Sequence, residues 1–118
     1  MENLVDKTIY AENMTNRHYY AISIKHTEYR WKFGKPCTLW GYHRTEDNEN
    51  RCFGGYTEDI NSAELYSMDE FITKYGSSIC CSEPVKMNPN LCKKYKKYDT
   101  VLIDRDEYDM YYRMCKVG

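Results

Sequence analysis

Alternation of apolar and polar residues predicts the first strand of the fold. Tyr20, Ile22, Ile24 and His26 alternate with Ala21, Ser23 and Lys25. This period of two is typical of a strand that buries one face. Residues 1–17 show little periodicity, so we expect a mobile or exchanged N-terminal arm there.

A second alternating stretch, Cys37–Tyr56, predicts a β-hairpin. Its ascending strand has Trp40, Tyr42 and Arg44 on one face and Leu39, Gly41 and His43 on the other. The run Thr45–Asn50 is rich in turn formers, which places the chain reversal there. We expect the return strand to start at Arg51–Phe53 and to break at Gly54-Gly55, a pair that permits positive φ.

Capping signals followed by a helical period predict three helices. The first starts at the capping box Ser67–Glu70 and ends at Gly76. The second starts at Asn88-Pro89, with Asn as the N-cap, and the third at Asp104, where Asp replaces Ser in the same capping logic. The expected inner faces are Met68, Phe71, Ile72 and Tyr75; Leu91, Cys92, Tyr95 and Tyr98; and Tyr108, Tyr111, Tyr112 and Cys115.

The remaining apolar runs complete a predicted α+β fold, with a mainly antiparallel sheet of about five strands and three short helices packed on it. Thr100–Ile103 is a continuous apolar run, which predicts a strand inside the sheet, covered on both faces. Ala63–Tyr66 reads as a short strand. Ser78–Cys81 and Val85–Met87 read as an extended segment that Pro84 confines to an edge or bulge. We expect a single domain over residues 1–118.

Composition narrows the classes of protein. Seventeen Lys and Arg against eighteen Asp and Glu give a net charge of −1, so we expect no stable nucleic-acid complex. No apolar run is typical of a signal peptide or a membrane span, which predicts a cytoplasmic protein without membrane contact. Six Cys without a Cys-x-x-Cys pair predict reduced, buried thiols and no metal site. Thirteen Tyr exceed what a core of this size needs and predict a homo-oligomer.

The hairpin and the last helix carry the candidate ligand-binding groups. Planar guanidinium groups and flat aromatic faces suit a phosphorylated planar ligand such as a nucleotide. The candidate residues are Trp40, Tyr42, His43, Arg44, Arg51, Phe53, Tyr56, Arg105, Tyr112 and Arg113. The alternative is an ordinary hairpin whose aromatic residues only pack across strands. The basic cluster Lys93–Lys97 is either a solvated helix face or a phosphate contact.

The sequence does not predict an enzyme or a cofactor. It contains no Gly-rich phosphate loop. A Cys–His nucleophile pair can be imagined from His43 and Cys52 across the hairpin, but the spacing is loose and nothing obvious orients the His. Two binding functions stay open. One is a protein that sequesters a small molecule, and the other is a protein inhibitor that uses its Tyr-rich surface and the acidic tip Glu46–Glu49.

Five stretches carry a resemblance to small proteins of phages and prophages of Clostridium-like bacteria. They are Tyr20–His26, Thr38–Arg44, Arg51–Thr57, Ala63–Ser67 and Tyr98–Ile103. In size, element order and composition the chain resembles the Thoeris anti-defence sponges, which sequester cyclic ADP-ribose signals.

That resemblance implies a homo-oligomer that holds its ligand between protomers with aromatic and Arg side chains, without turnover. In some members of the family it also implies a second site for cyclic oligonucleotides. The resemblance assigns no binding residue in this chain. A different phage inhibitor that binds a host defence protein, such as an anti-CRISPR, stays open.

Overall fold

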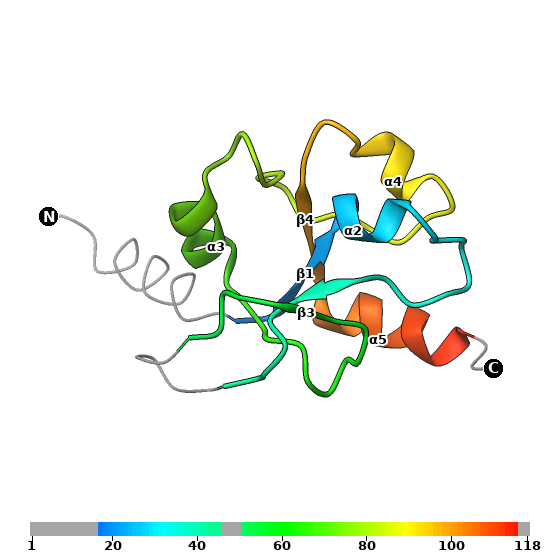
Figure 1. Cartoon of the computed structure of the whole chain (residues 1–118), viewed down its shortest axis with the longest axis horizontal. Coiled ribbons are helices and arrows are strands. Elements are labelled where there is room, and N and C mark those ends of the chain that lie inside the picture. Colours follow the sequence, from blue (N-terminus) through cyan, green and yellow to red (C-terminus); the bar gives the residue numbers. More distant parts are fainter. Residues whose placement is uncertain (1–16, 46–50, 116–118) are drawn as a thin grey trace, which may run out of the picture.

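The computed structural model describes residues 17–45 and 51–115. Apart from Arg17, the predicted N-terminal arm lies outside the described residues, and so does the acidic tip Glu46–Glu49. The described residues form an antiparallel sheet of four strands with four helices, as Figure 1 shows. The predicted α+β class is confirmed, with one strand fewer and one helix more than expected.

The sheet has the strand order β3-β2-β1-β4, and every pair of neighbouring strands is antiparallel. β1 and β4 are paired along their whole length, from Tyr19 opposite Asp104 to Ser23 opposite Thr100. The four strands are β1 (Tyr19–Ser23), β2 (Leu39–Trp40), β3 (Tyr56–Thr57) and β4 (Thr100–Asp104).

The first strand is shorter than the sequence predicts, because a helix replaces its second half. Ser23 ends β1, and its hydroxyl accepts a hydrogen bond from the backbone N–H of His26 at 3.2 Å. This cap opens α2 (Ile24–Glu28), which buries Ile24 and Thr27. The expected extension of the strand to His26 is therefore wrong, since a Ser cap favours a helix at that point.

The hairpin is real but pairs over only two residues on each side. Leu39 lies opposite Thr57 and Trp40 opposite Tyr56. Gly41 then takes a φ of +81°, and a Cβ built there would lie 2.5 Å from the Cβ of Glu64. The N–H groups of Gly41 and Tyr42 still donate to the carbonyls of Gly55 and Gly54, but the expected strand alternation does not continue to Arg44.

Two further predicted strands are wrong in extent. The return strand starts at Tyr56 rather than at Arg51, because the backbone N–H of Cys52 donates to the carboxylate of Glu64 instead of to a neighbouring strand. The predicted strand Ala63–Tyr66 is reduced to a single antiparallel bridge between Tyr66 and Tyr19.

β4 is covered on both faces, as the sequence predicts. Val101 and Ile103 belong to one core cluster and Leu102 to the other. β4 is the last of the four named strands, yet its outer edge is not exposed. The segment 79–85 closes it through hydrogen bonds from the N–H of Cys81 to the Thr100 carbonyl and from the N–H of Val85 to the Leu102 carbonyl.

The predicted caps start two of the helices. The side chains of Ser67 and Glu70 form the reciprocal capping box of α3 (Met68–Tyr75), which ends at Gly76 with a φ of +86°. Asp104 accepts from the backbone N–H groups of Asp106 and Glu107 and starts α5 (Arg105–Met114). Both starts are confirmed.

The remaining predicted helix is shorter and starts later than expected. α4 (Leu91–Lys94) is a single turn that follows Asn90 rather than Asn88. The side chain of Asn88 accepts from the N–H of Asn90 at 2.9 Å, so it closes a turn before the helix. The four lysines of the basic cluster are all exposed: Lys93 and Lys94 lie within α4, and Lys96 and Lys97 follow it.

The helices cover the two faces of the sheet separately. α3 packs through Phe71 on the face that carries Leu102, whereas α4 and α5 pack on the opposite face, through Leu91 and Tyr108 (Figure 1). All six Cys are free thiols, and five of them are buried. No helix in the described ranges has the length and apolar character required to span a bilayer.

Candidate functional site

The structure places Arg51 in a buried ion pair rather than on a ligand surface. Its side chain is 8% exposed and lies 3.0 Å from carboxylate oxygens of both Glu64 and Glu70. Its other N–H groups donate to the carbonyls of Thr45 and Leu65. Burial alone would lower the pKa of Arg51, but the hydrogen bond to Glu70 and the two acidic charges outweigh it, and the pKa is raised. All five guanidinium donors face partners within the described residues, so Arg51 holds the fold together.

Arg44 and Arg105 are brought together by one buried phenol. The hydroxyl of Tyr20 donates to Asp109 at 2.7 Å and accepts from Arg44 at 3.3 Å. Asp109 also lies 3.7 Å from the Nε of Arg105. Burial and Asp109 raise the pKa of Tyr20 to about 12, so the phenol keeps its proton. Tyr20 and Asp109 thus link the hairpin to the last helix, and the carboxylate of Asp109 neutralises part of the charge of Arg105.

The predicted aromatic residues fall into a packed group and an exposed group. Trp40 donates through Nε1 to Thr100 at 2.9 Å and packs against Tyr56 and Tyr75. Phe53 packs against Tyr66. This packing is the cross-strand alternative considered from the sequence.

The remaining predicted residues lie on the surface or are half-buried, away from the packed aromatic group. Tyr42 is 64% exposed, and His43 is also exposed. Tyr112 is half-buried against Tyr108, and Arg113 is exposed in the last turn of α5. The structure therefore does not gather the ten predicted residues into one site.

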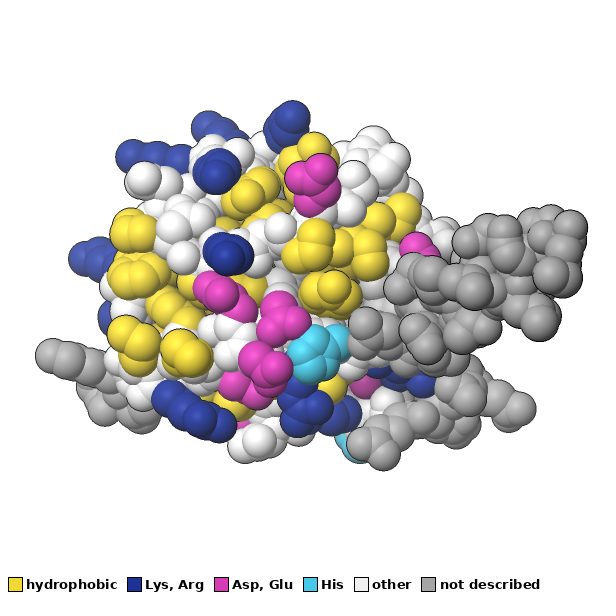
Figure 2. Space-filling model, turned by 180° about the vertical axis from the view of Figure 1, so that it is seen from behind, with side chains coloured by type: hydrophobic (Ala, Val, Ile, Leu, Met, Phe, Trp, Pro, Cys, Tyr) yellow, Lys and Arg dark blue, Asp and Glu magenta, His cyan; other side chains and the backbone are white. Residues whose placement is uncertain are grey.

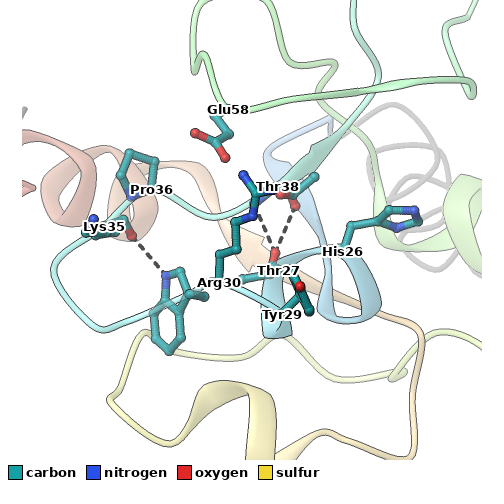
Figure 3. A pocket seen from close by; sticks show the side chains of 9 residues that line it. His26, Thr27, Tyr29, Arg30, Lys35, Pro36, Thr38 and Glu58 are labelled. Atoms are coloured by element: carbon teal, nitrogen blue, oxygen red, sulfur yellow. Dashed lines mark hydrogen bonds between the residues drawn. The ribbon is translucent and has the colours of Figure 1, made fainter.

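A cavity of about 390 Å³ lies between the end of α2 and the chain that enters β2 (Figure 3). Its size falls in the range of roughly 300–1,000 Å³ that is usual for small-molecule sites. We call it the α2 pocket. Its lining residues are His26, Thr27, Tyr29, Arg30, Trp31, Lys35, Pro36, Thr38 and Glu58.

Short-range hydrogen bonds shape the α2 pocket. The Thr27 hydroxyl accepts from the N–H of Thr38 at 2.9 Å, which ties α2 to the chain entering β2. The indole N–H of Trp31 donates to the carbonyl of Lys35 at 2.9 Å, as Figure 3 shows. Gly34 turns the chain between them with a φ of +102°. The pocket is therefore built largely by one connection, Tyr29–Thr38, folded back on α2.

The charged groups of the α2 pocket differ from those of the hairpin because they are unpaired. Within residues 17–45 and 51–115, no ion pair joins Arg30, Lys35 or Glu58 to any partner. Arg30 extends from the end of α2 toward Glu58 (Figure 3). Two cations and one carboxylate thus line a concave site with free hydrogen-bonding capacity, alongside the aromatic ring of Trp31.

One predicted residue does border this site. The ring of Tyr56 lies 4.1 Å from the ring of His26, centroid to centroid, and Tyr56 also contacts Trp40. A row of aromatic rings in tilted contact therefore connects the base of the hairpin to the pocket. His26 is held in place by the hydroxyl of Ser23, which lies 2.9 Å from its Nδ1.

The sequence contained a signal for the α2 pocket that the hairpin obscured. The connection after α2 interleaves aromatic and cationic residues, with Tyr29, Arg30, Trp31 and Lys35 close together. This is the same mixture that drew attention to the hairpin. Only the fold distinguishes the hairpin from the connection after α2. It gives Arg44 and Arg51 of the hairpin internal partners, whereas Arg30 of the connection forms no ion pair within the described residues.

A second polar cluster forms where β1 begins and β4 ends. The Nε2 of His18 lies 3.1 Å from Asp104 and 3.4 Å from Asp106, and these donor atoms are close enough to share a metal ion. The same distances are those of charge-assisted hydrogen bonds, and acids gather at a helix start because of its dipole. The absence of a metal site stays a prediction.

Comparisons with protein-family models, curated proteins and solved structures find no match to this chain.

Proposed function

We propose that this protein is a phage anti-defence protein that binds a cyclic nucleotide-derived immune signal and removes it from solution without cleaving it. The ligand class is that of cyclic ADP-ribose, with cyclic oligonucleotides as further candidates. The proposed setting is the cytoplasm of a bacterial host, and the proposed form is a homo-oligomer. The α2 pocket is the proposed binding site.

The observation that carries the proposal is the set of unpaired charges in a cavity of ligand size. Arg30 and Lys35 offer donors to a pyrophosphate, and a guanidinium can bind phosphate with two parallel hydrogen bonds. The rings of Trp31 and His26 offer flat faces to a base. Glu58 can accept hydrogen bonds from ribose hydroxyls or from an exocyclic amine. These are the groups that a phosphorylated planar ligand requires.

A hydrogen-bonded Ser and His lie beside the pocket, but their arrangement does not favour turnover. Ser23 and His26 are hydrogen-bonded, but the residue Ser23 is only 2% exposed and its hydroxyl caps α2. A buried capping hydroxyl cannot reach a ligand in the pocket. Sequestration needs only tight binding with slow release.

The proposal is tested by calorimetry of the purified protein against cyclic ADP-ribose isomers and cyclic di- and trinucleotides. Replacing Arg30 by Ala should weaken binding by about 1.5–3 kcal/mol, roughly ten- to a hundredfold, if it donates charge-assisted hydrogen bonds to phosphate. Arg30→Lys should restore only part of the affinity, because Lys lacks the planar fork. Lys32→Ala is the matched control, since Lys32 is an exposed cation of the same connection outside the pocket lining.

The outcomes separate the candidate functions. No binding to any of these compounds would favour the alternative, direct inhibition of a host defence protein. Recovery of a cleaved product by chromatography would show that the protein is an enzyme. Light scattering that gives only the monomer mass of 14.2 kDa at high protein concentration would contradict the proposed oligomer.

A further inference from the structure

An apolar groove with an acidic end runs along α5 and includes Phe33, from the connection that also builds the α2 pocket. Its volume is about 540 Å³. Figure 2 shows this side of the molecule, where hydrophobic side chains gather next to a group of acidic ones. We call it the α5 groove. Its lining residues are Phe33, Lys86, Met87, Asp104, Asp106, Glu107, Met110, Tyr111 and Met114.

The apolar floor of the α5 groove is not explained by the fold. Met110 and Met114 lie one helical turn apart on the same face of α5. Their side chains are 67% and 72% exposed, so this face of the helix is apolar and open to solvent. Phe33, on the opposite wall, is 48% exposed. Isolated exposed apolar residues are common, but a contiguous set around a concave surface marks an interaction site. Flexible Met side chains are suited to contacting the apolar face of a partner helix.

Charge decides which partner fits the groove. Three carboxylates, those of Asp104, Asp106 and Glu107, line it against the single ammonium of Lys86. Glu107 also accepts from the backbone N–H of Met87 at 3.3 Å, which holds the groove wall against α5. A second copy of this chain would bring more carboxylates than cations to the interface. A partner with Lys or Arg beside its apolar residues would match both parts of the groove.

We infer that the α5 groove binds a basic amphipathic helix of another protein. α5 spans ten residues, or about 15 Å, so the groove accommodates roughly three turns of a partner helix. The apolar face of that helix lies on Met110, Met114 and Phe33. Its cationic residues lie beside Asp106 and Glu107 at the acidic end.

The inference is tested with two synthetic helical peptides of about 14 residues that share one apolar pattern of Leu. One carries Lys on its polar face and the other carries Glu. The full chain should bind the Lys peptide, with an affinity that falls as salt is raised, and should bind the Glu peptide at least about tenfold more weakly. Fluorescence anisotropy of labelled peptides measures both affinities.

Matched variants locate the binding. Met110→Gln and Met114→Gln should each weaken the Lys peptide by about tenfold or more, whereas Ile79→Gln, at an exposed apolar residue outside the groove, should not. Asp106→Asn should weaken binding of the Lys peptide more than Asp69→Asn does. Asp69 is the matching control because it is an acid in the first turn of α3, as Asp106 is in α5. Both Asn variants lose a similar helix-dipole contribution, but Asp106→Asn also loses its contact with His18, so His18→Gln is included as the control for that loss.

Three results would overturn the inference. The first is equal affinity for the Lys and Glu peptides, and the second is loss of binding in Ile79→Gln as large as that in Met110→Gln. The third is self-association of the native chain that Met110→Gln abolishes, since a second copy would then be the occupant. Each result is independent of ligand binding in the α2 pocket.

Discussion

Replacing Arg51 by Ala should destabilise the protein rather than weaken ligand binding directly. The Arg51 guanidinium lies 3.0 Å from a carboxylate oxygen of Glu64, whose residue is only 1% exposed. Removing one partner of a buried ion pair typically costs about 3–5 kcal/mol, because the other charge stays buried without compensation. Backbone N–H groups still donate to Glu64, among them that of Cys52. We therefore expect a loss of stability at the lower end of this range, about 3 kcal/mol. This is a large part of the free energy of unfolding of a typical domain, roughly 5–15 kcal/mol.

The measurement is urea unfolding followed by the fluorescence of Trp31 and Trp40, the two Trp of the chain. Arg105→Ala is the control, because Arg105 forms a partly exposed pair with Asp109 at 3.7 Å. Such pairs contribute about 0–1 kcal/mol.

A second substitution separates buried charge from lost contacts. In an Arg51→Met background, Glu64→Gln removes the uncompensated carboxylate while keeping an oxygen that can accept from backbone N–H groups. It should recover at least about 1 kcal/mol, which a double-mutant cycle would report as coupling between Arg51 and Glu64. The reasoning is refuted if Arg51→Ala costs less than about 1 kcal/mol, or if it abolishes ligand binding at an unchanged unfolding midpoint.

Three more outcomes follow from the described contacts. Gly41→Ala should cost clearly more than Gly76→Ala in urea unfolding, because both need a positive φ, worth about 1–3 kcal/mol, but only at Gly41 would the new Cβ meet Glu64; equal losses would contradict this. Burial raises the pKa of Cys92 from 9.0 to about 11, so its contribution to stability is present below about pH 9 and is lost as the pH rises through 11; urea midpoints in reducing buffer should fall over that interval, and a flat profile would argue against it. Asp104→Ala should cost about 0.5–2 kcal/mol through loss of the α5 cap, with Asp104→Asn recovering most of it in the same assay.

Features decided by near neighbours in sequence could be predicted. The capping box of Ser67 and Glu70, the Asp104 cap and the positive φ at Gly76 all depend on residues within one helical turn. The covered strand β4 was also predictable, because only a strand buried on both faces tolerates an uninterrupted apolar run there.

The hairpin shows what sequence pattern could not supply. Its alternation is genuine, but Glu64, a residue beyond the hairpin, accepts from the backbone N–H groups of Thr45 and Cys52. Those groups are then no longer available to a strand ladder. The same Glu64 turns Arg51 from a candidate phosphate ligand into an internal partner. The hairpin sequence by itself does not predict a contact with the carboxylate of Glu64.

The position of the α2 pocket could not be predicted from the sequence. Of the ten residues predicted from the sequence, Tyr56 borders the α2 pocket through its contact with His26. The position was missed because a pocket requires the connection Tyr29–Thr38 to fold back over α2, which depends on hydrogen bonds such as that from the N–H of Thr38 to the Thr27 hydroxyl. Composition cannot show which cations will lack partners.

The pairing of β1 with β4 has a consequence for when the chain can fold. β1 lies near the start of the described residues, and β4 begins only at Thr100. Contacts between such distant segments must overcome a loop-closure entropy before any packing rewards them, which slows folding. The other neighbour of β1, β2, pairs with it at one position, Ile22 opposite Leu39, which gives little stability on its own. We therefore expect β1 to stay without its main partner during synthesis until β4 has been made.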